Sequence, residues 1–302
     1  MARLKEYNGH YCESEYEYAF IGFLEAEGWK YSSGNNISRV TKRDVLIADD
    51  FKKFIADTNP DLTEDEVIQI YDNVRLVGAE SDFATLHKVY GWMVNGVQFT
   101  TQDGLPRMIP LIDFDNWDKN IFRVVNQFTV EYTNNGQKEN RRPDVLLFVN
   151  GMPLCVIELK NPADANATIY DAWEQINIRY WRDIPHLLHY CPLACISDGV
   201  KTRLGTVRTP YEHFYAWRRV NEGDAVSTLP FAETETMIKG VYAPERFMEI
   251  FRDYIYFQDS IYDSDEVEII CRYPQFFAAK LLKQSIVNSV VTRSGKGGTY
   301  FG

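Results

Sequence analysis

The sequence is poor in cysteine and contains no long apolar segment. Only five of its 302 residues are Cys, and a small odd number of cysteines in a chain of this length argues against a disulfide framework. No stretch approaches the roughly 20 apolar residues needed to cross a membrane. Residues 1–6 lack the apolar core of a secretory signal. We therefore expect a cytoplasmic protein.

Positive charge is also in deficit. Lys and Arg number 32 against 43 Asp and Glu, which gives a net charge of -11 and excludes a surface that is uniformly attractive to DNA. Local clusters matter more, because individual Lys and Arg side chains make the phosphate contacts. Residues 201–220 are one such cluster, with aromatic residues among the bases. Two interpretations stay open, a solvated basic face over core aromatics or a DNA-contact surface.

The composition otherwise predicts a globular chain, at 45% hydrophobic and 14% aromatic residues. Apolar periodicity, capping residues and turn signals define the expected elements. Helices are expected at 16–27, 50–57, 63–76, 169–181 and 243–257. Strands are expected within 86–115, at 122–132, on both sides of Asn150-Gly151 and at 193–197. This pattern predicts an α/β fold, a mixed central β-sheet flanked by helices.

The most informative segment is the hairpin predicted around Asn150-Gly151. Two apolar, β-prone stretches flank this dipeptide, which is a strong signal for a two-residue turn. Asp144 lies at the far end of one stretch, and Glu158 and Lys160 lie at the far end of the other. Folding the hairpin therefore gathers two carboxylates and a lysine at one end of a sheet.

The register of this hairpin raises a conflict. A two-residue turn pairs Val149 with Met152, and a regular ladder then pairs Asp144 with Ile157. Asp144 would face away from Glu158, because opposed residues share a face and neighbours alternate. We therefore predict an odd loop length, a β-bulge or a bend at Pro143-Asp144 that restores a shared face.

Two carboxylates beside a lysine fit the chemistry of a metal-dependent nuclease. Mg²⁺ prefers oxygen ligands, commonly one or two carboxylates completed by phosphate and water, so Asp144 and Glu158 are the candidate metal ligands. Lys160 would contact the scissile phosphate or the attacking hydroxide as a point charge. The alternative is an ordinary hairpin with solvated terminal charges.

The hairpin sequence RPDVLLFVNGMPLCVIELKNP resembles the PD-(D/E)xK nuclease core of the R subunits of Type I restriction-modification enzymes. Further similar segments before and after it extend the resemblance over most of the chain. The resemblance implies an endonuclease that cleaves double-stranded DNA in an ATP-dependent complex with methyltransferase and specificity subunits. It also implies Mg²⁺ and ATP as cofactors.

The resemblance implies particular site residues. Asp144, Glu158 and Lys160 match the catalytic triad of the family. Glu17 matches the acidic residue of its first helix, although Glu13 and Glu15 compete for that position, and a solvated helix position is the alternative.

A glutamine motif follows the hairpin in the same family. Gln175 matches the glutamine of its Gln-x-x-x-Tyr pattern. Tyr180 lies five residues after Gln175 instead of four, so we retain Gln175 and regard Tyr180 as a poor candidate.

The sequence also predicts two regions. Residues 1–230 are expected to form the nuclease domain, and residues 231–302 a helical connection and the truncated start of a helicase-like motor domain. The acidic run from Asp259 to Glu268 contains no base and is expected to be an exposed connection. Gln275 resembles the adenine-contacting glutamine that precedes such motors, with a plain helix start after Pro274 as the alternative. Residues 299–301 resemble the first motor strand. No G-x-x-x-x-G-K-[ST] phosphate loop is present, so we expect no ATPase activity.

Two other functions remain open at this point. One is a docking module for the motor and partner subunits with a silent site, and the other is a repair-type nuclease with the same core. For the chain alone we expect weak, salt-sensitive DNA binding that does not depend on base sequence, with little or no cleavage.

Overall fold

The computed structural model describes residues 13–78, 80–161, 168–226, 231–258 and 266–291. Its centre is a six-stranded mixed sheet in the order β1-β4-β7-β8-β9-β10. Parallel pairs join β1 to β4 and β8 to β9, and the other neighbours are antiparallel. These strands are β1 (Lys30–Ser33), β4 (Phe122–Asn126), β7 (Val145–Val149), β8 (Met152–Leu159), β9 (Leu193–Ser197) and β10 (Thr202–Thr206).

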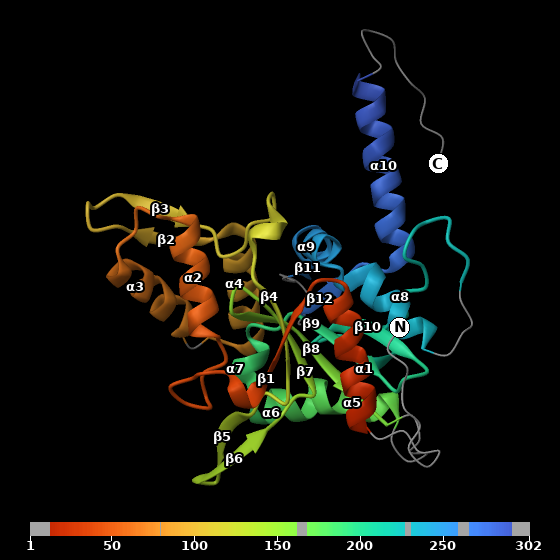
Figure 1. Ribbon diagram of the computed structural model, residues 1–302, viewed down its shortest axis with the longest axis horizontal. Coiled ribbons are helices and arrows are strands. Elements are labelled where there is room, and N and C mark those ends of the chain that lie inside the picture. The colour runs from red at the N-terminus through yellow and green to blue at the C-terminus, as the bar shows by residue number, and fades with distance from the viewer. Residues whose placement is uncertain (1–12, 79, 162–167, 227–230, 259–265, 292–302) are drawn as a thin grey trace.

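Three two-stranded sheets surround the central one. They are β2 (Val97–Thr100) with β3 (Pro106–Ile109), β5 (Val130–Asn134) with β6 (Gln137–Arg141), and β11 (Ile255–Gln258) with β12 (Val267–Ile270). The β5–β6 hairpin projects from the body at the bottom of the view in Figure 1.

Helices cover the sheet and form a lobe beside it (Figure 1). The longer ones are α1 (Glu13–Ala26), α2 (Ala48–Thr58), α3 (Glu64–Arg75), α4 (Asp82–Asn95), α9 (Pro244–Asp253) and α10 (Tyr273–Val291). The shorter ones are α5 (Ile169–Glu174), α6 (Trp181–Asp183), α7 (Pro185–Leu188) and α8 (Ala232–Met237), with π-helical segments η3 (Gln175–Tyr180) and η5 (Ile238–Tyr242) and 3-10 turns η1 (Gly34–Asn36), η2 (Trp117–Lys119) and η4 (Tyr211–His213).

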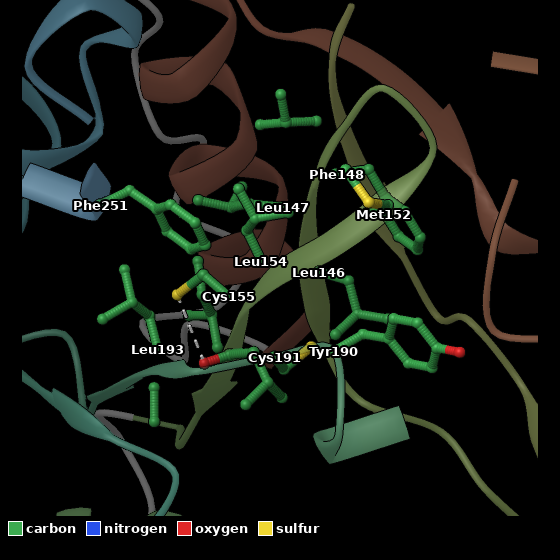
Figure 2. Packing of buried hydrophobic residues seen from close by; sticks show 14 of the residues in the cluster. Leu146, Leu147, Phe148, Met152, Leu154, Cys155, Tyr190, Cys191, Leu193 and Phe251 are labelled. Atoms are coloured by element: carbon green, nitrogen blue, oxygen red, sulfur yellow. Dashed lines mark hydrogen bonds between the residues drawn. The ribbon is translucent and has the colours of Figure 1, made fainter. Parts of the chain in front are cut away.

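The two faces of the central sheet contact different helices. On one face, Ser197 of β9 hydrogen-bonds Tyr16 of α1 at 2.7 Å, and Cys155 of β8 lies 3.6 Å from the Tyr242 hydroxyl. Figure 2 shows Cys155 packed near Leu154 and Leu193 in the core. On the other face, Glu158 of β8 contacts the α5–η3 helix. Side-chain alternation along β8 therefore decides which residues meet α5.

The expected α/β fold is confirmed, and so are several elements. Thr63 and Glu66 form the predicted capping box at the start of α3, because each satisfies a backbone N–H left open in the first turn. The helix expected at 169–181 is present as α5, η3 and α6.

The prediction of strands within 86–115 is correct only for the second part of that range, which contains β2 and β3. Residues 82–95 instead form α4, which begins at the N-cap Ser81. Phe83, Leu86, Tyr90 and Met93 are buried along it, and their spacing of three or four residues is that of one helix face.

Two other predicted elements are shorter than expected. The strand expected at 122–132 stops at Asn126, because Gln127 adopts a left-handed backbone with φ 53°, and Val130 begins a separate hairpin. The helix expected at 243–257 ends at Asp253, and β11 follows it.

The acidic segment expected to be exposed after Phe257 is partly outside the described residues. Within the described part, Glu268 of β12 is buried, so that part of the prediction is wrong. Strand pairing with β11 turns this side chain inward, opposite Phe257.

Buried residues before and after residue 230 belong to one hydrophobic core, which extends from Tyr16 to Phe276. The division into regions 1–230 and 231–302 stays a prediction. The expected motor strand at 299–301 lies outside the described residues. Within the described residues, no helix has both the length and the apolar character required to cross a bilayer.

Candidate active site

The hairpin turn is fixed by both its sequence and its surroundings. Asn150 and Gly151 have φ values of 49° and 76°, as a two-residue turn of the favoured twist requires. The Asn150 side chain accepts from the Ile121 N–H at 2.8 Å and donates to the Leu111 carbonyl at 2.9 Å. A Cβ on Gly151 would lie 2.2 Å from the Ile47 carbonyl oxygen, so only glycine fits there.

The predicted irregularity of the hairpin is a β-bulge. Val149 pairs with Met152, but the register shifts between Leu147 and Phe148, so that Val145 pairs with Ile157. Asp144 therefore lies opposite Glu158. One extra residue on β8 places both carboxylates on the same face, toward α5.

The two carboxyl groups lie opposite each other and influence each other's pKa. Burial raises the pKa of Glu158 well above its usual range, and the neighbouring Asp144 charge raises it further. Burial also raises the pKa of Asp144, against the opposing effects of the Leu159 N–H, which donates to it at 2.8 Å, and of the Lys160 charge. Two buried acids this close cannot both ionise without a neighbouring cation.

Gln175 links the basic and acidic parts of the site. Its Oε1 accepts from Lys160 Nζ at 3.0 Å, and its Nε2 donates to Glu158 Oε2 at 2.7 Å. We call Asp144, Glu158 and Lys160 the carboxylate edge. The structure thus brings the four residues predicted around the hairpin into one cluster.

Tyr180 also belongs to this cluster, contrary to its assessment from spacing. Its hydroxyl donates to Glu158 Oε1 at 2.5 Å and accepts from Gln175 Nε2 at 2.8 Å. Burial and the Glu158 charge raise the Tyr180 pKa well above its usual range, so the hydroxyl remains a donor.

The π-helical segment η3 explains how the five-residue spacing still works. A π-helix closes its hydrogen bonds over five residues instead of four. Gln175 and Tyr180 are the first and last residues of η3, so residues five apart return to the same face. The prediction assumed α-helical pitch, which is why it rejected Tyr180.

Glu17 is buried on α1, so the solvated alternative is wrong. Its two carboxylate oxygens accept from Asn126 Nδ2 at 2.6 Å and from Gln127 Nε2 at 2.7 Å. Asn126 pairs with Val145, on the face of the sheet opposite Glu158. A catalytic role for Glu17 stays a prediction.

The donor set at the carboxylate edge suits a hard divalent cation. Asp144 and Glu158 offer adjacent carboxylate oxygens whose raised pKa values a cation would lower. In the described part of the chain, no group of three His, Cys, Asp or Glu side chains forms a closed metal site. Mg²⁺ usually completes its coordination shell with phosphate oxygens and water.

Gln275 lies in the first turn of α10, and its Oε1 accepts from the Arg272 N–H at 2.8 Å. This contact satisfies a backbone N–H group at the start of the helix, as the alternative of a plain helix start predicts. An adenine contact for the exposed Gln275 amide stays a prediction.

The basic cluster at 201–220 contains several residues engaged within the protein. Arg208 lies over the Phe83 and Trp181 rings, and Arg219 donates to the Glu222 carbonyl. Trp217 is buried. Whether the remaining bases contact DNA stays an open question.

A six-stranded mixed sheet with helices on its faces, and a central hairpin that carries the carboxylate edge, defines a nuclease-like α/β domain. A family model described as the Type I restriction enzyme R protein N terminus matches residues 11–213. The chain therefore belongs to this family.

Curated relatives agree with the family match. The chain is 30% identical over 300 residues to a Methanocaldococcus jannaschii protein that is named as the MjaIXP endonuclease subunit of a type I restriction enzyme. The alignment covers 91% of this chain and 28% of that protein. It is 28% identical over 301 residues to the type I restriction enzyme HindI endonuclease subunit of Haemophilus influenzae, covering 94% of this chain and 27% of that protein. The chain thus spans little more than a quarter of the length of these relatives.

Proposed function

We propose that this chain is the endonuclease domain of a Type I restriction enzyme and hydrolyses phosphodiester bonds of double-stranded DNA with Mg²⁺. The observation that carries the proposal is the β-bulge, which sets Asp144 and Glu158 side by side next to Lys160. A regular ladder would have separated the carboxylates. The names of the relatives as endonuclease subunits support the same function.

Each residue of the cluster has a distinct role in this proposal. Asp144 and Glu158 hold the cation, which supplies a water of lowered pKa and neutralises charge on the phosphate. Lys160 binds the scissile phosphate or the attacking hydroxide. Gln175 and Tyr180 hold the Glu158 carboxylate in place through hydrogen bonds, and supporting residues of this kind tune metal sites.

The activity of the larger protein is part of the proposal as well. We propose that cleavage depends on ATP, on a motor region beyond the matched part, and on methyltransferase and specificity subunits that read the DNA sequence. Gln275 would contact the adenine of ATP. These statements rest on membership of the Type I restriction enzyme family.

Substitution of Lys160 tests the assigned roles. Lys160→Ala should reduce cleavage at least a hundredfold, within the range that a single charge-stabilising group contributes, while Mn²⁺ binding measured by calorimetry is retained. Asp144→Ala should lose both cleavage and Mn²⁺ binding. Lys119→Ala, at an exposed lysine of η2 outside both the site and the 201–220 cluster, is the matched control. Unchanged cleavage by Lys160→Ala in the assembled enzyme would contradict the assignment.

A further inference from the structure

An exposed basic surface lies on the β5–β6 hairpin side of the carboxylate edge. It comprises Lys42 and Arg43, from the loop between η1 and α2, and Arg142, between β6 and β7. We call these three residues the basic rim. Residues 39–43 contain no acid, which is notable in a chain of net charge -11.

The loop that carries Lys42 and Arg43 is fastened to the start of β5. The Arg39 guanidinium lies 3.8 Å from the centre of the Phe128 ring, and its Nη2 donates to the Thr129 carbonyl at 2.8 Å. The Glu131 N–H donates to the Lys42 carbonyl at 2.9 Å. These contacts hold the backbone of the rim in place and leave its side chains exposed.

Backbone hydrogen bonds also connect the β5–β6 hairpin to the carboxylate edge. The Gln127 N–H donates to the Asp144 carbonyl at 3.0 Å, and Val130 pairs with Arg141, three residues before Asp144. Arg142 precedes Asp144 by two residues, so its positive charge lies beside the carboxylate edge. Figure 1 shows the β5–β6 hairpin projecting beside the loop between β1 and α2.

The charges of the rim residues Lys42, Arg43 and Arg142 have no ion-pair partner in the part of the chain that the structure describes. The neighbouring Arg141 differs, because it is bound to Asp183. Uncompensated exposed charges beside a candidate active site attract an anionic partner at little desolvation cost.

We propose that the basic rim binds the sugar-phosphate backbone of duplex DNA to one side of the scissile phosphate. This inference rests on the proposed nuclease function, since that function places DNA at the carboxylate edge. Lys and Arg contacts to phosphate carry no base information, so the rim seats the duplex without sequence preference. It supplies the positive charge that the acidic chain lacks as a whole.

The test is binding of a fluorescent duplex of random sequence to the 302-residue chain across a salt series, without divalent metal. The triple variant Lys42→Ala, Arg43→Ala, Arg142→Ala should bind about tenfold or more weakly at moderate salt. Its log–log salt slope should fall by about 2 to 3, since each lost phosphate contact removes about 0.9. The control triple Lys53→Ala, Lys119→Ala, Lys239→Ala makes the same change in net charge and should behave as the wild type.

Two further measurements separate the possible failures. A charge-preserving triple, Lys42→Arg, Arg43→Lys, Arg142→Lys, should retain wild-type binding, and its success assigns the effect to charge and not to folding. Equal salt slopes for the rim variant and the control variant would overturn the basic rim as a DNA surface. Rim-dependent binding by a wild-type chain that does not bind Mn²⁺ would leave the rim standing and overturn the proposed nuclease function.

Discussion

Glu158→Gln should stabilise the metal-free protein while it abolishes cleavage. Glu158 is buried beside Asp144, and both its burial and the Asp144 charge raise its pKa well above the usual range. The native state therefore binds a proton, or carries an unfavourable charge, where an unfolded glutamate would be ionised. Glutamine keeps the size of the side chain and can still accept from the Tyr180 hydroxyl.

The expected magnitude follows from the cost of protonation. Protonating an ordinary glutamate at pH 7 costs about 3 to 4 kcal/mol. This cost is also the largest destabilisation that the buried Glu158 carboxyl can cause, because the group can take up a proton instead of remaining charged. The glutamine amide leaves the Gln175 donor less well satisfied, which costs about 1 kcal/mol. A net gain of about 2 to 3 kcal/mol remains, which would raise Tm by about 4 to 6 °C in a chain of this size.

The dependence on pH has a definite sign. Because folding raises the Glu158 pKa, its contribution to stability is fully present below the ordinary glutamate pKa and is lost as the pH rises toward the folded value. The advantage of Glu158→Gln should therefore vanish near about pH 5, where the cost of protonation equals the loss of about 1 kcal/mol at Gln175, and should grow toward neutral pH. Thermal unfolding measured over a pH series checks this trend.

Divalent cation reverses the comparison. Mn²⁺ at a hundredfold excess over its Kd should stabilise the wild type by about 2.7 kcal/mol, because it binds the folded state, and should leave Glu158→Gln unchanged. Glu174→Gln is the control. Glu174 ends helix α5 and pairs with Arg179 at the surface, so this variant should respond to Mn²⁺ as the wild type does. A metal-free Glu158→Gln protein no more stable than wild type at pH 7 would refute this account of the buried pair.

Three further predictions concern other positions. Tyr180→Phe removes a hydrogen bond that lowers the Glu158 pKa, so the acid limb of the pH–rate profile for cleavage should move to higher pH; an unmoved limb would exclude the contact. Gly151→Ala should cost about 2 kcal/mol or more in denaturant unfolding, since alanine disfavours positive φ and its Cβ would clash with Ile47. Glu268→Met should raise Tm more at pH 7 than at pH 4.5, because burial raises the pKa of the Glu268 carboxyl well above its usual range; equal changes at both pH values would contradict this.

The features predicted correctly from the sequence are those that local chemistry controls. Asn150-Gly151 specifies a tight turn through its preference for positive φ, and Thr63 with Glu66 specifies a helix start through hydrogen bonds made within one turn. The conflict between a two-residue turn and a shared face for Asp144 and Glu158 was visible in the sequence. It required an irregularity, and the structure places that irregularity between Leu147 and Phe148.

The features missed depend on geometry that linear spacing does not record. Tyr180 was rejected because motif spacing assumes a uniform helical pitch. The α4 helix was taken for strand because an Asn-Gly pair at its end also signals a hairpin, although its buried residues repeat at helical spacing. Glu268 was taken as exposed because its inward orientation comes from pairing with β11 and packing on the sheet, which are tertiary effects.

The η3 segment has a consequence for how such chains evolve. An added residue in an α-helix normally rotates everything beyond it by about 100°, which would uncouple α6 and α7 from the sheet. The wide turn at Gln175–Tyr180 takes up the surplus locally, so the helix keeps its alignment on both sides. A one-residue insertion at this point can then be tolerated without loss of the hydrogen bonds that Glu158 makes with Gln175 and Tyr180. Searches that demand a fixed gap between the glutamine and the tyrosine will overlook chains that have tolerated this change.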